Sequence, residues 1–203
     1  TQIQVIQNIN SSKFAKNDDF ISTISPDSTI SFYQYTQKDS INYEKIKQLK
    51  ISPIKGTGQA GTAFTTVEFS PDNKFFVTTS EDSVARLWKF EDVKNLPQDS
   101  IKPIIQLKHP AILTDALFSP NNNLFLTVAN DNIVRLYDLE GKQKAVLKGH
   151  ADSVSDVNFS PDGKYIVTGS LDFTVRLWDL AGNEIQIFTN HRAKIQKAKF
   201  SSD

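Results

Sequence analysis

The chain has 203 residues, with 23 Lys plus Arg and 23 Asp plus Glu, so its formal net charge is zero. This balance argues against a nucleic-acid binder and against a polybasic membrane-surface module, since both carry an excess of basic residues. The absence of cysteine excludes disulfides, cysteine zinc sites and thiol catalysis, and with only three histidines we expect no metal and no cofactor.

The two ends of the chain predict strands of incomplete units. Residues 1–7 (TQIQVIQ) are interpreted as an outer β-strand, and residues 193–200 (AKIQKAKF) as the innermost strand of a further unit. The sequence contains no methionine, even at position 1, so we expect a processed chain or a fragment of a longer protein. No apolar run reaches the roughly 18 residues of a membrane span, and no secretory signal is visible. These features predict a cytoplasmic location without membrane contact.

A repeat accounts for most of the chain between these ends. Its units begin at Phe14, Phe69, Phe118 and Phe159, and a last, incomplete copy begins at Phe200. The last two spacings between these phenylalanines are equal, and the first two are longer. The basic unit is therefore about 41 residues long, with insertions in the first two copies.

Two further positions recur in each full unit, at a constant distance from its phenylalanine. An aspartate stands thirteen positions after the phenylalanine, and an aromatic residue stands nineteen positions after it. The aspartates are Asp27, Asp82, Asp131 and Asp172, and the aromatic residues are Tyr33, Trp88, Tyr137 and Trp178. The four units thus align over these positions without gaps.

The histidines follow the same frame. His109, His150 and His191 are separated by the length of one basic unit, and each lies nine positions before a unit phenylalanine. Unrelated catalytic or metal sites would not share such a spacing. We therefore assign the three histidines to a repeated structural device.

The fourth unit predicts four short β-strands, over residues 153–159, 164–170, 174–180 and 184–190. The first two are joined by Ser-Pro-Asp-Gly from Ser160 to Gly163, which has the composition of a tight turn. Four antiparallel strands in a unit of about 41 residues make one blade of a β-propeller. No long stretch follows the helical period, so the predicted fold class is all-β.

The units resemble WD40 repeats. The residues that carry the resemblance are Gly149-His150, the turn from Ser160 to Gly163, and Trp178-Asp179, and the pattern covers nearly the whole chain. The resemblance implies a WD40-like β-propeller segment over residues 1–203, with about four full blades plus two part-blades. We expect this segment to be a piece of a larger propeller.

The resemblance also implies a structural hydrogen-bond network in each blade, made by a His, a Ser or Thr, an Asp and a Trp. Only the fourth unit has the full set, His150, Ser170, Asp172 and Trp178. The second unit keeps Ser80, Asp82 and Trp88 but has Ala60 at the histidine position, and the third keeps His109 and Asp131 but has Ala129 and Tyr137. We expect these incomplete networks to hold their blades less rigidly.

Three motifs suggest chemistry, and the repeat offers a structural explanation for each. Gly56 to Gly61 matches the dinucleotide pattern G-x-G-x-x-G, but the β-branched residues that follow predict a strand where that pattern needs a helix. His150, Ser170 and Asp172 have the composition of a hydrolase triad, yet the expected network explains all three. Arginines four residues after the turn aspartates could form an anion-binding ring, but we expect local hydrogen bonds and packed stems. These arginines are Arg86, Arg135 and Arg176.

Side chains that differ between units while the frame repeats lie in the aspartate turns and in the loops between blades. Such variation is typical of a binding face on a rigid scaffold. The candidates for partner contacts are Pro26, Glu81, Asn130, Leu171, Asp152 and Arg192. Leu171 is the strongest single candidate, because it is an apolar residue at a tight turn.

We therefore expect a non-catalytic scaffold for protein–protein interaction, or a sensor module, within a larger multidomain protein or complex. Its expected partners are proteins or other domains of the same polypeptide, and not nucleic acid. The alternative is a small-molecule-binding or enzymatic propeller that uses the central channel. Such a protein needs clustered catalytic residues or metal ligands, whereas every histidine here belongs to the repeat frame.

Overall fold

The structure, a computed structural model, describes residues 11–14, 20–25, 29–38, 40–50, 63–97 and 100–201. These residues form four sheets, and in each sheet four strands lie side by side in chain order. All neighbouring strands are antiparallel. The all-β prediction is therefore confirmed.

The strands of the four sheets are as follows. The first sheet has β1 (Ser11–Phe14), β2 (Phe20–Ser25), β3 (Thr29–Lys38) and β4 (Ser40–Lys50). The second has β5 (Phe64–Phe69), β6 (Phe75–Ser80), β7 (Val84–Lys89) and β8 (Ile105–Lys108). The third has β9 (Leu113–Phe118), β10 (Leu124–Ala129), β11 (Val134–Asp138) and β12 (Gln143–Leu147). The fourth has β13 (Val154–Phe159), β14 (Tyr165–Ser170), β15 (Val175–Asp179) and β16 (Glu184–Phe188).

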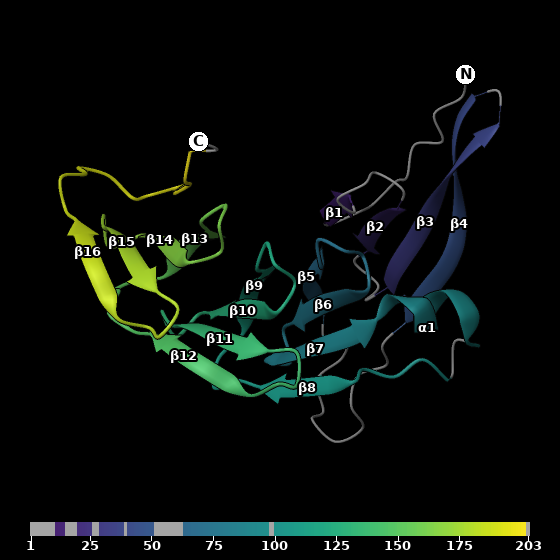
Figure 1. Cartoon of the computed structure of the whole chain (residues 1–203), viewed down its shortest axis with the longest axis horizontal. Helices are drawn as coiled ribbons and strands as arrows, with labels where there is room; N and C mark the ends of the chain where they lie inside the picture. Colours follow the sequence, from purple (N-terminus) through teal and green to yellow (C-terminus); the bar gives the residue numbers. More distant parts are fainter. Residues whose placement is uncertain are drawn as a thin grey trace.

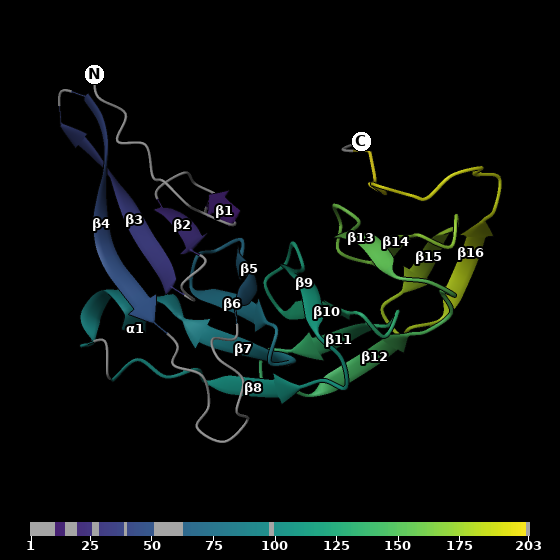
Figure 2. The same cartoon turned by 180° about the vertical axis from the view of Figure 1, so that it is seen from behind.

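The sheets follow one another along an open arc, as Figure 1 and the reverse view in Figure 2 show. The first strand of each sheet lies on the inner side of the arc, and the fourth strand lies on the outer side. Each sheet packs face to face against the next, which is how the blades of a β-propeller are arranged. The arc does not close into a ring.

In the second, third and fourth sheets, the turn between the first two strands is held by the serine that follows the unit phenylalanine. The Ser160 hydroxyl donates to Asp162 at 2.6 Å and accepts from the Tyr165 amide at 2.9 Å. The hydrogen bond from Ser160, together with bonds from the Lys164 amide and side chain, lowers the pKa of Asp162 to about 2. Ser70 and Ser119 make the corresponding bonds in the second and third sheets. The repeated Phe-Ser-Pro motif therefore sets where one strand ends and the next begins.

The core consists of apolar clusters between adjacent sheets. Between the first and second sheets the cluster is aromatic, with Phe32 and Phe76 both fully buried and their ring centres 5.1 Å apart. Burying one such phenylalanine contributes about 1.5–3 kcal/mol relative to leaving it exposed. Between the third and fourth sheets the cluster is mainly aliphatic, and Trp178 packs into it from β15. The junctions share a position in the repeat but differ in side-chain chemistry.

The two long spacings of the repeat have separate structural causes. In the first unit β3 and β4 form a hairpin of 10- and 11-residue strands, which is longer than the other hairpins described. In the second unit a helix, α1 (Phe90–Asn95), follows β7, and its Phe90 and Val93 are buried. The sequence pattern did not predict this helix, because six residues are too few to display a helical period.

The last predicted strand differs from the expectation. No strand is assigned to residues 193–200, since no described strand lies beside this segment to pair with it. Nevertheless Ile195 and Ala198 are buried against Val167 of β14, in one cluster. The Ile195 amide donates to the Ser170 carbonyl at 3.1 Å, and Asp156 accepts from the Ala198 amide at 2.8 Å. The segment thus packs on the fourth sheet as β13 packs on the third. The predicted strand at residues 1–7 lies outside the described residues.

Candidate functional site: hydrogen-bond networks and turn rim

The fourth blade contains a buried network centred on His150. Its Nδ1 lies 2.9 Å from Oδ2 of Asp172, and its Nε2 lies 2.7 Å from the hydroxyl of Thr168. The indole nitrogen of Trp178 donates to the same hydroxyl at 2.9 Å. The Ala151 amide and the Thr174 hydroxyl also donate to Asp172, at 2.9 and 2.7 Å. The network joins β14 and β15 to the loop that precedes β13 and fixes the turn that carries Asp172.

The hydroxyl in this network comes from Thr168, whereas the sequence pattern predicted Ser170. Both residues lie on one face of β14, because side chains two apart in a strand point the same way. Thr168 is within reach of the Trp178 ring, while Ser170 stands at the end of the strand. There the Ser170 hydroxyl donates to the Asp152 carbonyl at 2.9 Å and accepts from the Asp172 amide at 3.1 Å. The prediction that Ser170 bonds to His150 and Trp178 was therefore wrong. The residue that does so, Thr168, lies two positions earlier in β14.

The third blade has a different pattern around the same positions. Nε2 of His109 lies 2.9 Å from the Thr127 hydroxyl and 3.2 Å from the Tyr137 hydroxyl. Its Nδ1 lies 3.0 Å from the Leu107 carbonyl oxygen, and no hydrogen bond joins it to Asp131 within the described residues. Asp131 instead pairs with Arg135, at 3.2 and 2.6 Å. A backbone carbonyl takes the place of the carboxylate at His109.

The second blade uses the arginine pattern as well. Arg86 donates twice to Asp82, at 3.2 and 2.5 Å, and once to the Ser80 hydroxyl at 3.0 Å. Its side chain is almost fully buried. The Trp88 indole donates to Thr78 at 3.0 Å, again two positions before the expected serine. Ser80 donates to Asp82, so its hydroxyl belongs to the arginine pair, whereas the indole of Trp88 bonds to Thr78.

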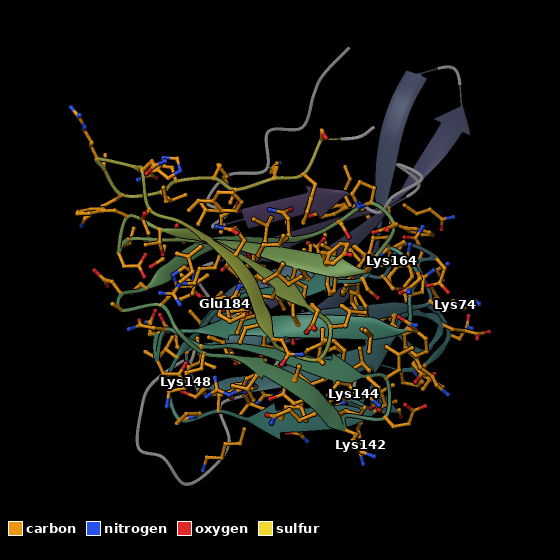
Figure 3. The ribbon with its side chains drawn as sticks, turned by 60° about the vertical axis from the view of Figure 1, so that its left-hand side comes forward. Lys74, Lys142, Lys144, Lys148, Lys164 and Glu184 are labelled. Atoms are coloured by element: carbon orange, nitrogen blue, oxygen red, sulfur yellow. The ribbon has the colours of Figure 1, made fainter. Side chains whose placement is uncertain are left out.

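The turn aspartate therefore has one of two partners. Asp82 and Asp131 pair with the arginine four residues later, whereas Asp172 pairs with His150. In the fourth blade the corresponding Arg176 turns away and binds Glu184 at 2.6 Å (Figure 3 labels Glu184). Gly149 makes this possible, because a Cβ there would overlap Nη1 of Arg176. The arginines form local pairs, and the structure shows no ring of free guanidinium groups among the described residues.

Burial and these contacts shift the ionisation of the network residues. Burial lowers the pKa of His150 and of His109, and for His150 it outweighs the opposite effect of Asp172. Partial burial would raise the pKa of Asp172, but hydrogen bonds from Thr174, the Ala151 amide and His150 hold it well below its usual range. At neutral pH the pair is a neutral imidazole with a carboxylate. That state suits a fixed structural bond.

The turns that carry the aspartates lie beside the loops that precede the first strands. The Leu171 amide donates to the Ser153 carbonyl at 3.0 Å, and the Asn130 amide donates to the Ile112 carbonyl at 2.9 Å. We call this surface the turn rim; it comprises residues 81–83, 130–132 and 171–173 with the loops 109–112 and 150–153. Turns and loops thus form one surface at the same end of their blades.

The predicted partner-contact residues lie at different places on or near the turn rim. Glu81, Asn130 and Asp152 are exposed, and Arg192 is exposed in the segment that follows β16. Leu171 is only partly exposed. Pro26 and the glycine-rich stretch from Gly56 to Gly61 lie outside the described residues. The candidate that the sequence analysis missed is Phe173, 44% exposed beside Leu171 and with a backbone φ of 70°.

The family comparison agrees with this architecture. A family model described as "WD domain, G-beta repeat" matches residues 52–89, 101–138 and 141–179, which together exceed half of the chain. The chain belongs to the WD40 family. A search among curated proteins found no match to it.

The WD40 repeats and the blades are offset along the chain. The match over residues 141–179 begins with β12, the outer strand of the third sheet, and continues through β13, β14 and β15 of the fourth. The match over residues 101–138 likewise begins with β8, the outer strand of the second sheet, so these two WD40 repeats each contribute their first strand to the preceding blade. The first sheet precedes all three matched ranges.

Two other surfaces of this WD40 chain are less specific. A cavity of about 390 Å³ beside α1 is lined by Lys74, Lys89 and Lys94 together with apolar rings, and none of the histidines reaches it. Lys144 is exposed on the outer strand β12, and Lys142 and Lys148, which flank this strand, are exposed as well (Figure 3). Lysines on an edge strand are a common protection against pairing with other chains. The described part of the chain contains no helix with the length and apolar character of a membrane span.

Proposed function

We propose that this protein is a non-catalytic scaffold for protein–protein interaction and that its partners bind the turn rim. WD40 repeats generally mediate such interactions. One observation carries the proposal: in three blades the turn is held by hydrogen bonds to its aspartate, from an arginine or a histidine, while the neighbouring turn residues differ. Glu81, Asn130 and Leu171 occupy the same position of successive turns. A rigid frame with variable tips supports recognition of a specific partner.

The proposal assigns structural roles to the network residues. In the fourth blade these are His150, Thr168, Asp172 and Trp178, with Ser170 beside them. In the other blades they are Ser80, Asp82, Trp88, His109 and Asp131. The support is that His150 and Trp178 are buried and that the bonds of these side chains end within the protein. A hydrolase triad would instead need an exposed nucleophile.

The sequence also predicts how this propeller segment belongs to a larger protein. Residues 1–203 would form one propeller segment within a multidomain protein or complex, and residues 193–200 would supply the innermost strand of a further blade. A sensor role and a cytoplasmic location also stay predictions. The packing of Ile195 and Ala198 on β14 supports the further blade.

The direct test compares partner capture by the unmodified chain with capture by Glu81→Lys and Leu171→Asp variants. Lys142→Glu, just before β12, serves as a control charge change away from the turn rim. Proteins that are captured by the unmodified chain and the control, but lost with either rim variant, support the proposal. Equal capture by all four chains would overturn it.

The enzymatic alternative has its own test. If His150 has a structural role, His150→Ala should lower the thermal midpoint of unfolding without removing any enzymatic activity. A loss of turnover on any substrate with an unchanged melting curve would favour the enzyme instead.

A further inference from the structure

We propose that the turn Leu171–Asp172–Phe173 is a preformed apolar anchor and that it binds a protein segment in which apolar residues are flanked by Asp or Glu. This inference deepens the proposed scaffold function and rests on it. It names the part of the turn rim that makes the main contact and the chemistry of the partner.

Phe173 has a backbone conformation that is unusual for a bulky residue. Its φ of 70° is left-handed, as are the φ values of 62° at Ser83 and 64° at Asn132, which occupy the same position of the other turns. Glycine and asparagine adopt this region readily, whereas a bulky side chain there is a genuine outlier. The frame of the turn requires the left-handed backbone but not the phenylalanine. Folding alone would favour a small polar residue.

Phe173 is also exposed next to a second apolar residue of the same turn. Phe173 is 44% exposed, and its ring makes no aromatic or cation–π contact with another described residue. Leu171, on the other side of Asp172, is also partly exposed. The corresponding pairs are Glu81 with Ser83 and Asn130 with Asn132, which are polar. An apolar pair at this turn is therefore a property of the fourth blade and not of the repeat.

The turn that carries Leu171 and Phe173 is held by several hydrogen bonds. Asp172 accepts hydrogen bonds from the Ala151 amide, His150 and Thr174, and the Phe173 amide donates to the Ser170 carbonyl at 3.3 Å. The two apolar side chains therefore stand on a backbone that is held from several sides. Binding then costs little backbone entropy, which is the condition for an efficient anchor.

The charges around the turn indicate the partner. The bond between the Ile195 amide and the Ser170 carbonyl brings the segment after β16 beside the turn. In that segment Arg192 and Lys194 are exposed, and neither forms an ion pair with another described residue. The acidic groups nearby are Asp172, which the network occupies, and the exposed Asp152, whose Oδ1 accepts from the Ser153 amide. Two free cations beside an apolar turn fit carboxylates that flank apolar side chains.

The experiment selects peptides from a phage-displayed random dodecapeptide library on the full chain. We expect enrichment of peptides that combine bulky apolar residues with Asp or Glu. A selected synthetic peptide should bind Phe173→Asn at least about tenfold more weakly than the unmodified chain. A double Arg192→Ala and Lys194→Ala variant should bind more weakly too, and its affinity should depend less on salt. Asn132→Gly, at the matching turn of the third blade, is the control and should bind normally.

The melting curve separates an anchor from a structural residue. Because asparagine tolerates the left-handed φ and removes an exposed ring, Phe173→Asn should keep or raise the thermal midpoint while it weakens binding. A lower midpoint with unchanged binding would overturn the inference. Selected peptides that are basic, or that depend on Glu81 and Asn130 but not on Phe173, would overturn it too and leave the scaffold function standing. If no peptide binding responds to any rim variant, both proposals fail.

Discussion

Nδ1 of His150 lies 2.9 Å from Oδ2 of Asp172, while at the matching positions of the third blade His109 contacts a backbone carbonyl and Asp131 binds Arg135. The same frame thus supports two ways to satisfy a turn carboxylate. In one the partner is an imidazole from the preceding loop, and in the other it is a guanidinium from the next strand. The two choices predict different pairwise energies in otherwise similar blades.

Double-mutant cycles should reveal this exchange of partners. We expect a coupling free energy of about 1–3 kcal/mol between His150 and Asp172, and below about 0.5 kcal/mol between His109 and Asp131. Alanine variants measured by chemical denaturation provide both values. The pair of Asp131 and Arg135 should couple clearly, whereas Asp172 and Arg176 should not. Equal coupling of histidine and aspartate in the two blades would contradict the exchange.

Thr168→Val should be among the more damaging conservative changes in the fourth blade. It preserves shape but leaves the buried nitrogens of His150 and Trp178 without their shared partner, at a cost of about 3 kcal/mol. Thr78→Val deprives Trp88 of its partner and should cost about half as much. Denaturant midpoints measure both losses. The exposed Thr189 is the control, and a Thr189→Val variant as unstable as Thr168→Val would refute the bridging role.

Stability should fall as the pH drops below about 6.5. The pKa values of His109 and His150 are lowered from 6.5 in the folded chain, so below that pH the unfolded chain binds more protons than the folded one. Each histidine then removes at most about 1.4 kcal/mol of stability per pH unit, and above pH 7.5 neither contributes a slope. Thermal midpoints between pH 5 and 8 test this. A His109→Gln, His150→Gln double variant should show a flatter dependence, and an unchanged slope would speak against the histidines as its source.

Gly169→Val should release the last described segment from the fourth blade. A Cβ at Gly169 would lie 2.5 Å from Cγ2 of Ile195, a branched side chain that is packed in place. Faster hydrogen exchange at the Ile195 and Ala198 amides would report the release. In the third blade Val128 holds the same position and shares a cluster with the smaller Val154. Adding Ile195→Ala to Gly169→Val should therefore restore much of the protection of these amides against hydrogen exchange. Exchange as fast in the double variant as in Gly169→Val alone would contradict this account.

The sequence predicted the frame of this fold well because the spacing of the repeat is a long-range regularity. The strands expected at 153–159 and 164–170 agree with β13 and β14 to within one residue at each end. The period could not decide which hydroxyl meets Trp178, because Thr168 and Ser170 share a strand face. Nor could it decide whether a turn aspartate takes a histidine or an arginine, since that depends on side-chain rotamers. Phe173 could have been noticed, because the other described turns have Ser83 and Asn132 at this position.

The offset between repeats and blades determines where this chain can be divided. A cut between β12 and β13 keeps four strands in each sheet, whereas a cut at the start of a matched repeat, before β12, strips the third sheet of its outer strand. Ala145 and Leu147 would leave with that strand, and they are 6% and 2% exposed. The hydrophobic cluster they help to form would then open to water. A truncation designed from the sequence repeat would damage the blade that it was meant to preserve.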